Sequence, residues 1–310
     1  MYLESFVLPV ESEEGLINKR IDENGGYIDN IYPCGLFGKK DFSEILFRKI
    51  TIFYGGNGSG KSTILNLIAQ RLELNRIAPF NSGELFDAYA ARCKYTLGYD
   101  DEGFPYRIPN GSRIITSDDI FDYMLAARTN NTDMREAIEK GKETYSELKW
   151  GKTLPFRGLE DYESLHLQLQ ARSKSVTRRQ FIRKNIGQET RLQSNGETAL
   201  RYFETKLKND TLYCLDEPEN SMSPQMQLSL VSMLEEMARY CGCQFIIATH
   251  SPFLLALEGA RIYDLDSKPV QTREWWQLDN VRTYYEFFKK HEHLFQHGGN
   301  TQENSGTSFY

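Results

Sequence analysis

Short apolar segments alternate along the chain with longer segments in which apolar residues recur every three or four positions. The apolar segments, rich in β-branched and aromatic residues, predict buried strands at residues 45–54, 112–116, 211–215 and 244–248. The amphipathic segments predict helices at residues 64–69, 120–128, 198–207 and 225–240. Because the two kinds of element alternate, the pattern predicts an α/β fold in which helices flank a sheet.

Residues 126–192 interrupt this alternation. Segments 133–148 and 161–184 are rich in Glu, Lys and Arg and predict two helices, with breaks at Gly141, Gly151, Pro155 and Gly158. No heptad pattern continues for the three or four repeats of a coiled coil, so we expect a short helical lid. The sequence thus predicts a core at residues 1–125 and 193–295, an insertion at 126–192 and a disordered polar tail at 296–310.

A glycine-rich loop lies between the first predicted strand of the core and its first helix. It reads Gly55-Gly56-Asn57-Gly58-Ser59-Gly60-Lys61-Ser62-Thr63 and fits the phosphate-loop pattern G-x-x-x-x-G-K-[ST]. Its glycines allow backbone N–H groups to turn toward phosphate oxygens, and the following helix directs its dipole at the same anion. Lys61 is then expected at the β- and γ-phosphates and Ser62 at Mg²⁺. The loop therefore predicts ATP and Mg²⁺ as cofactors.

Acidic residues and a histidine follow two later strands. Asp216 and Glu217 end the strand at 211–215, where buried acids are costly unless a cation or proton meets them. We expect Asp216 to hold Mg²⁺ through water and Glu217 to orient and deprotonate the attacking water. His250 follows the strand at 244–248 at the same edge of a parallel sheet, where it is predicted to bind the γ-phosphate. Alone, such an acidic pair often starts a helix and such a histidine is often a packed residue.

Ser194-Asn195-Gly196-Glu197 precede the helix predicted at 198–207. A serine and a glycine before a helix provide a hydroxyl and free N–H groups for an anion. By itself, this sequence is more typical of a plain turn and helix cap.

The order of these motifs resembles the ATP-binding-cassette (ABC) ATPases, P-loop NTPases with a mixed sheet. The resemblance implies that Ser194-Asn195-Gly196-Glu197 form the signature motif, which completes the ATP site of the opposite subunit in a homodimer. It implies that Lys61 and Ser62 belong to the phosphate loop and that Asp216 is the second Mg²⁺ ligand. It makes Glu217 the catalytic base and His250 the switch histidine. Asn220-Ser221-Met222-Ser223 take the place of the dimer-facing D-loop.

The neighbouring residues are similar to the SMC-like and RecF-like cytosolic branch, which includes stand-alone bacterial ATPases. They are Pro218-Glu219-Asn220 after the acidic pair and Ser251-Pro252-Phe253 after the histidine. Transporter cassettes usually carry other residues there.

Two positions depart from the family's pattern. The strand at 112–116 is followed by Ser117-Asp118-Asp119 and lacks the usual glutamine that touches Mg²⁺. Asp118 or Asp119 is a candidate substitute, while a helix cap at Ser117 or Asp118 is the alternative. No convincing adenine-stacking aromatic is found, because Tyr32 and Phe37 are more typical of packing.

Composition and charge bear on which kinds of partner the chain can bind and on the compartment in which it works. The net charge of -6 argues weakly against a chain that coats nucleic acid, yet residues 172–191, from Arg172 to Arg191, hold seven basic residues and one acid. That segment predicts either a solvated helix face or a contact with DNA, RNA or an acidic partner. Five cysteines without a disulfide pattern predict reduced thiols and a cytoplasmic protein, and no apolar run is long enough for a membrane span.

Three functions remain. The first is an ATPase coupled to a nucleic-acid transaction, alone or with a nuclease, as in DNA repair or phage defence. The second is a regulatory ATPase that docks a protein effector. The third, the energy subunit of a transporter, is disfavoured by the missing glutamine and by the residues that follow Asp216-Glu217 and His250.

Overall fold

The computed structural model describes residues 1–15, 17, 32–80, 82–100, 102–151, 162–173, 177–178, 180–181 and 195–297. The chain divides into two compact units. One comprises Met1–Ile120 and Phe203–Tyr310, and the other Phe121–Tyr202, a wider span than the insertion predicted at 126–192.

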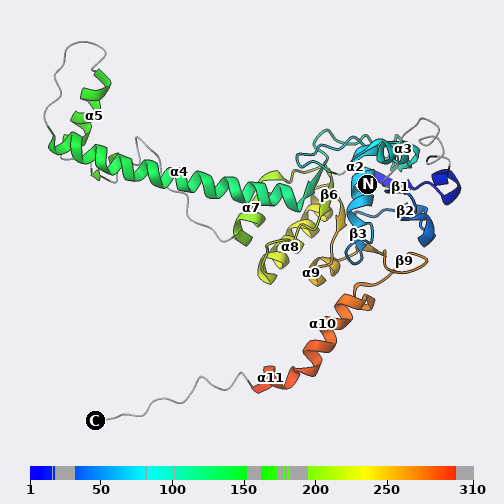
Figure 1. Ribbon diagram of the computed structural model, residues 1–310. Helices are drawn as coiled ribbons and strands as arrows, with labels where there is room; N and C mark the ends of the chain where they lie inside the picture. The colour runs from blue at the N-terminus through cyan, green and yellow to red at the C-terminus, as the bar shows by residue number, and fades with distance from the viewer. Residues whose placement is uncertain are drawn as a thin grey trace, which may run out of the picture. The chain divides into compact units, whose positions relative to one another are not determined.

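The first unit contains a six-stranded sheet in the order β5-β6-β7-β3-β8-β9 (Figure 1). Its strands are β3 (Ile50–Tyr54), β5 (Arg113–Thr116), β6 (Leu212–Asp216), β7 (Gln244–Ala248), β8 (Arg261–Asp264) and β9 (Gln271–Thr272). The first five in the sheet order run parallel, and β9 pairs antiparallel with β8. Phe53 lies opposite Ala248, and Asp216 lies between Thr116 and Ala248. The carboxyl ends of β3, β5, β6 and β7 therefore meet at one edge of the sheet, where parallel sheets bind ligands.

A second, antiparallel sheet has the order β2-β1-β4. Its strands are β1 (Leu3–Val7), β2 (Glu44–Leu46) and β4 (Lys94–Leu97). The single strand predicted at residues 45–54 is therefore wrong, because β2 and β3 belong to different sheets. The chain turns where the Arg48 N–H donates to Thr51 Oγ1 at 2.9 Å. Ile45 and Ile52 are both fully buried, so the apolar pattern continues across the turn and hides it.

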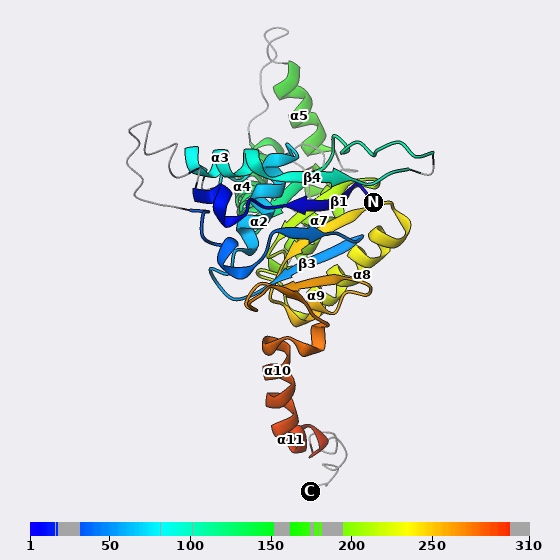
Figure 2. The same ribbon diagram turned by 90° about the vertical axis from the view of Figure 1, so that its right-hand side faces the viewer.

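Two helices of the first unit, α2 (Lys61–Arg71) and α8 (Pro224–Tyr240), begin close to the predicted positions. The unit also contains helices that were not predicted: α3 (Glu84–Arg92), α9 (Pro252–Leu255), α10 (Asp279–Lys290) and α11 (Glu292–His297), with 3-10 turns η1 (Gly38–Lys40) and η3 (Trp275–Gln277). Helix α2 packs against α3, β5, β6 and β7 (Figure 2). Its Ile64 and Ile68 share one hydrophobic core with Phe53 and Ile246. Helix α8 packs against β7 and α9. The predicted tail at 296–310 overlaps the end of α11, and the rest of it lies outside the described residues.

Helix α4 (Ser117–Trp150) leads into the second unit as one continuous helix of 34 residues, roughly 51 Å long. The predicted break at Gly141 is wrong, because one interior glycine costs only about 1 kcal/mol in a segment rich in strong helix formers. Helix α5 (Tyr162–Arg172) ends well before residue 184. Arg172, the last residue of α5, donates a hydrogen bond from Nη2 to Gly151 O at 2.7 Å. In the same unit, the ring centroids of Tyr145 and Phe181 lie 5.2 Å apart. Helix α7 (Asn195–Lys206) leads back into the first unit.

Gln244, the first residue of β7, ties the two sheets of the first unit together. Its side chain is 1% exposed and makes hydrogen bonds to both polar groups of the Leu3 peptide. The Oε1 atom accepts from Leu3 N at 2.9 Å, and Nε2 donates to Leu3 O at 2.7 Å and to Arg48 O at 3.2 Å. Because buried backbone groups need partners, this one amide fixes where β1 begins.

We expect Gln244→Ala to lower the free energy of unfolding by about 2–4 kcal/mol, because it leaves buried donors and acceptors without partners. Urea unfolding followed by circular dichroism measures the change. The matched control is Gln225→Ala at an exposed position of α8, expected to change stability by less than about 0.5 kcal/mol. Equal effects of the two variants would show that Gln244 does not join the sheets.

Candidate functional site

The loop from Gly55 to Gly60 connects β3 to α2 and has the backbone of a phosphate cradle. Gly55, Gly58 and Gly60 have φ values of 157°, 76° and 105°, which side-chain-bearing residues rarely adopt. At Gly60 a Cβ atom would also lie 2.8 Å from the ring of Phe37. Helix α2 then begins at Lys61, so its first N–H groups and its positive dipole end face the loop.

Two charged side chains from distant segments brace this loop. Lys40 Nζ donates to Ser59 O at 2.9 Å and to Leu265 O at 2.7 Å. Asp266 Oδ2 accepts from Gly56 N at 2.8 Å. These residues were not predicted, because 225 positions separate Lys40 from Leu265 and no local motif connects them.

Lys61 lies inside the curve of the loop. Its side chain is 5% exposed, and Nζ donates to Gly55 O at 2.7 Å and to Gly56 O at 3.1 Å. The same nitrogen lies 3.9 Å from Glu217 Oε1. A cation held by the cradle in this way is suited to contact phosphate oxygens.

Ser62 and Asp216 form an oxygen pair suited to Mg²⁺. Ser62 Oγ donates to Asp216 Oδ1 at 3.0 Å. Burial raises the pKa of Asp216 to about 6, while the Ser62 hydrogen bond opposes that shift. Mg²⁺ is typically held by one or two protein oxygens together with substrate phosphates and water. The described part of the chain holds no group of three or more His, Cys, Asp or Glu residues that could cage a metal.

Glu217 lies at the centre of the predicted catalytic residues. Its Oε1 atom lies 3.5 Å from His250 Nδ1, and its Oε2 accepts from Asn220 Nδ2 at 3.3 Å. The backbone has φ 47°, and the Glu217 N–H donates to Ala248 O at 2.9 Å, which fixes β6 to the end of β7. Because a non-glycine residue rarely adopts positive φ, the surrounding contacts must impose this conformation. With a side chain 27% exposed, the carboxylate is accessible to water.

His250 is held through its main chain by two residues that were not predicted. Glu219 Oε1 accepts from Thr249 Oγ1 at 2.5 Å and from His250 N at 3.3 Å, and burial raises the pKa of Glu219. Asn280, at the start of α10, donates from Nδ2 to His250 O at 2.8 Å. Glu219 could have been predicted as a site residue, because it belongs to the acidic segment that follows β6. Asn280 could not, because no local motif in the sequence marks it.

A cavity of about 340 Å³ opens over the cradle. Its lining residues are Tyr32, Leu36, Asn57, Gly58, Ser59, Gly60, Lys61, Ser62, Thr63 and Glu217. Tyr32 borders the cavity and donates from its hydroxyl to Thr63 Oγ1 at 2.9 Å, while its ring stacks on Phe86. Phe37 is 0% exposed beneath Gly60. Both rings are therefore packed, as the sequence suggested.

Asp119, one of the two candidates to replace the missing glutamine, is committed to structural hydrogen bonds. Its Oδ2 accepts from Thr116 N at 2.8 Å and Thr116 Oγ1 at 2.9 Å, and its Oδ1 accepts from Ala78 N at 3.0 Å. In return, Asp119 N donates to Thr116 Oγ1 at 3.4 Å. This reciprocal pair is a capping box at the start of α4. The cap is thus Thr116, not Ser117 or Asp118 as predicted, and Asp118 is exposed.

The remaining predicted site residues lie apart from this cluster. Asn195, Gly196 and Glu197 form the first turn of α7 in the second unit, while Ser194 lies outside the described residues. Most of the basic segment at 172–191 also lies outside them. In the D-loop segment, Ser221 has φ 66°, Met222 is buried, and Ser223 caps α8 by accepting from Met226 N at 3.4 Å.

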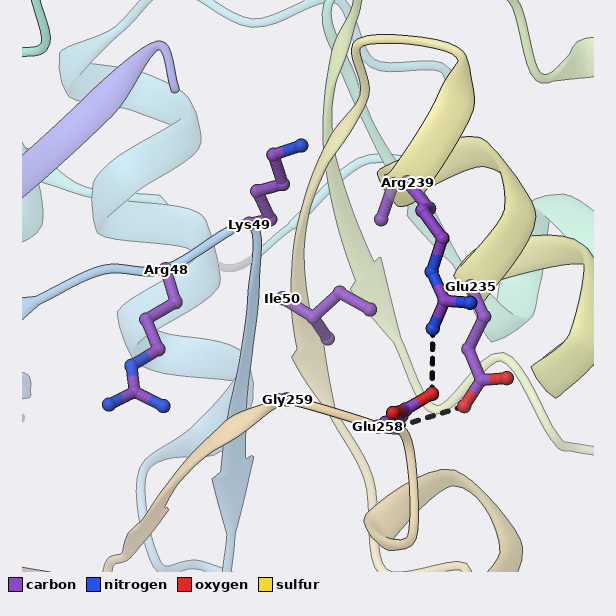
Figure 3. Close-up of a pocket in the computed structure, with 8 residues that line it drawn as sticks. Arg48, Lys49, Ile50, Glu235, Arg239, Glu258 and Gly259 are labelled. Carbon is purple, nitrogen blue, oxygen red and sulfur yellow. Dashed lines mark hydrogen bonds and ion pairs between the residues drawn. The ribbon is translucent and has the colours of Figure 1, made fainter.

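A second cavity, of about 330 Å³, lies at the amino end of β3, opposite the edge that carries the cradle (Figure 3). Arg239 Nη2 pairs with Glu258 Oε2 at 2.6 Å, and Glu258 N donates to Glu235 Oε1 at 2.8 Å. Arg48 and Lys49 also line the cavity, but Figure 3 shows their side chains pointing away from that group. The cavity is thus separate from the cluster around Lys61.

One protein-family model, described as "AAA domain, putative AbiEii toxin, Type IV TA system", matches residues 194–256. That span begins at Ser194 and includes Asp216, Glu217 and His250. The fold is a mixed α/β fold with a parallel-rich sheet and a glycine-rich loop between β3 and α2. The predicted α/β fold class is confirmed, and the family match supports ATP binding and ATPase activity.

Solved structures are similar to this ATPase in outline. The SMC head domain from Thermotoga maritima has a TM-score of 0.39 and 16% identity and covers 88% of this chain and 99% of its own. The Smc head domain from Pyrococcus furiosus, bound to the C-terminal domain of ScpA, has a TM-score of 0.39 and 12% identity. The match covers 94% of this chain and 99% of that domain. A dimeric ATP-binding cassette in a post-hydrolysis state, bound to ADP and Pi, has a TM-score of 0.34 and 13% identity. The match covers 75% of this chain and 88% of the cassette. At these low values the likeness assigns no residue role. No curated protein sequence matches the chain.

None of the described helices of the ATPase is long and apolar enough to cross a membrane.

The capping box leads to a prediction for the missing glutamine. We expect Asp119→Ala to lower the free energy of unfolding by about 1–3 kcal/mol, because it breaks the cap and leaves the buried Ala78 N–H without a partner. Asp118→Ala is the matched control and should leave stability nearly unchanged. Mg²⁺ titrations of ATP hydrolysis by both variants test the relay separately. A higher Mg²⁺ requirement in Asp118→Ala alone would assign the relay to Asp118, and unchanged requirements in both would end that idea.

Proposed function

We propose that this chain hydrolyses ATP with Mg²⁺ as a dimer that closes on two ATP molecules. The observation that carries the proposal is the convergence of Lys61, the Ser62–Asp216 pair and Glu217 at the carboxyl edge of one parallel sheet. Helix α2 contributes Lys61 and Ser62, β6 ends at Asp216, and Glu217 follows β6 directly, so each side chain has a defined place around the cradle.

The cradle and Lys61 bind and orient the triphosphate. Backbone N–H groups of the loop and the first turn of α2 donate to phosphate oxygens, and Lys61 contacts the β- and γ-phosphates. Ser62 and Asp216 would hold Mg²⁺, which when bound neutralises charge that develops on the phosphates. At neutral pH Asp216 is mostly ionised, because its raised pKa of about 6 still lies below 7.

Glu217 acts as the base in the hydrolytic step. It accepts a proton from a water molecule while the water oxygen bonds to the γ-phosphorus. The bond between that phosphorus and the β–γ bridging oxygen breaks, and its electron pair leaves with ADP. His250 stands 3.5 Å from Glu217 and orients the carboxylate and the water. The products are ADP and inorganic phosphate.

The proposed dimer brings the start of α7 to the ATP of the partner subunit. Ser194, Asn195, Gly196 and Glu197 carry the resemblance to a signature motif. A helix N-terminus with a glycine suits a phosphate. The buried Gly196 and exposed Glu197 are compatible with an end that is packed on one side and accessible on the other.

We further propose that turnover is coupled to a nucleic-acid transaction or a nuclease partner in the cytoplasm. The basic composition of residues 172–191 supports a nucleic-acid contact, and the free state of all five cysteines supports a reducing compartment. A second candidate, regulation of a protein effector, is favoured by the family description, which names a toxin–antitoxin system. Co-purification of the ATP-bound Glu217→Gln variant with nucleic acid or with protein distinguishes the two.

The catalytic roles are tested by two substitutions. We expect Lys61→Ala to abolish ATP binding, whereas Glu217→Gln should keep ATP affinity and lower kcat by about 10²–10⁴-fold, because Glu217 acts on the water. Nucleotide binding by fluorescence and phosphate release measure both effects. Glu236→Gln, at an exposed position of α8, is the control and should behave as the wild type. Normal turnover by Glu217→Gln would remove this residue from the base role.

The ATP sandwich is tested through the signature segment. We expect Ser194→Arg to keep ATP binding and lose turnover, because a long cation blocks the approach of the partner's phosphate. In the Glu217→Gln background with ATP, Ser194→Arg should also weaken the trapped dimer. Titration calorimetry and sedimentation velocity with ATP measure binding and association. Full hydrolysis by Ser194→Arg would contradict the sandwich.

A further inference from the structure

Helices α10 and α11 carry an apolar surface that the described part of the chain leaves exposed. Six of its side chains are between 46% and 67% exposed: Tyr284, Tyr285, Phe287, Phe288, Leu294 and Phe295. Trp275 and Trp276 of η3 adjoin it and are 37% and 52% exposed. We call these eight residues the aromatic surface. Only Val281 of α10 is buried.

The aromatic surface follows from the helical spacing of α10. Residues 281, 284, 285 and 288 lie on one side of the helix, and residues 282, 283, 286 and 290 on the other. The apolar side is continuous into α11, because the Phe288 and Phe295 rings lie 6.1 Å apart. On the polar side, Arg282 pairs with Glu286 at 3.7 Å. The helix thus has one side for water and one for another apolar surface.

The size of the surface matches one half of a protein interface. Large aromatic side chains present about 150–250 Å² each, so the exposed fractions of the six helical residues amount to about 650 Å². Soluble monomers rarely expose contiguous apolar patches beyond a few hundred Å². Two such surfaces in contact would bury about 1,300 Å², within the usual range for a specific complex. The sequence at 298–310 contains two large apolar side chains, Phe309 and Tyr310, against the six of the two helices.

The charged ends of α10 lie away from its apolar side. Asp279 at the first position and Lys290 at the last fall on the same side of the helix as Thr283 and Glu286. Pairing through the apolar side therefore leaves both charges in water. A lipid surface fits less well, because membrane-surface helices carry mainly Lys and Arg on their polar side, whereas α10 mixes both signs.

We propose that the aromatic surfaces of two copies of this chain pair with one another, which makes the protein a dimer before ATP binds. The pairing is independent of the proposed ATP sandwich. Where both occur, the tether makes closure of the two ATP sites an intramolecular step with a high effective concentration.

Sedimentation velocity without nucleotide, at micromolar protein, tests the pairing. We expect the wild type to be a dimer and the double variant Tyr285→Glu/Phe288→Glu to be a monomer, with a dissociation constant raised about 30-fold or more. Tyr99→Glu, at another exposed tyrosine, should remain a dimer. Because all three substituted side chains are exposed, thermal unfolding and ATP affinity should stay at wild-type values, which controls for folding.

A wild type that is monomeric without nucleotide would overturn the proposal, as would a dimer that the double variant leaves intact. Binding of monomers to phosphatidylcholine–phosphatidylserine vesicles, lost in the double variant, would assign the surface to lipid instead. The ATP sandwich has a separate readout, since Glu217→Gln combined with Tyr285→Glu/Phe288→Glu should still dimerise when ATP is added.

Discussion

The hydrogen bond between Ser62 and Asp216 is the contact on which the site depends. It joins the first turn of α2 to the end of β6, although 154 positions separate the two residues. Only the parallel register of β3, β7 and β6 brings those ends together, and that register also sets Glu217 beside His250 and Lys61. A slip of one residue in β6 would turn Asp216 to the other face of the sheet. The chemistry therefore depends on strand alignment as much as on the identity of the side chains.

Burial and strain at this edge are tolerated because each has a compensating contact. Asp216 is largely withdrawn from water, and the Ser62 hydroxyl offsets part of the penalty. Glu217 adopts a left-handed backbone, and its N–H is fixed to Ala248 O. Lys40 donates to the Ser59 carbonyl and Asp266 accepts from the Gly56 N–H, so two side chains constrain the main chain of the glycine loop. Preorganised polar groups of this kind need little rearrangement when charge develops.

The site residues that could be predicted from the sequence are those that belong to short contiguous motifs. The loop from Gly55 to Thr63, the pair Asp216-Glu217 and His250 could be found because each follows an apolar strand directly. Lys40, Asp266 and Asn280 could not, because their partners are far away in the chain. The break between β2 and β3 was missed because Ile45 of β2, Phe47 of the turn and all of β3 are buried and apolar or β-branched, so the pattern does not change across the turn. The cap at α4 was misplaced because Thr116 is at once the last residue of β5 and the partner of Asp119.

Asn280 gives the ATPase a physical connection between its aromatic helix and its catalytic edge. One amide of this residue bonds to the main chain of His250, and its own N–H donates to the Tyr54 hydroxyl at 3.1 Å. Any shift of α10 must therefore be shared with His250, whose imidazole stands against Glu217. Thermodynamic linkage makes such a connection reciprocal. If whatever binds α10 changes the affinity for ATP by some factor, ATP changes the affinity of α10 for its partner by that same factor. The Asn280 side chain is thus the contact through which α10 and the catalytic edge would be coupled in both directions.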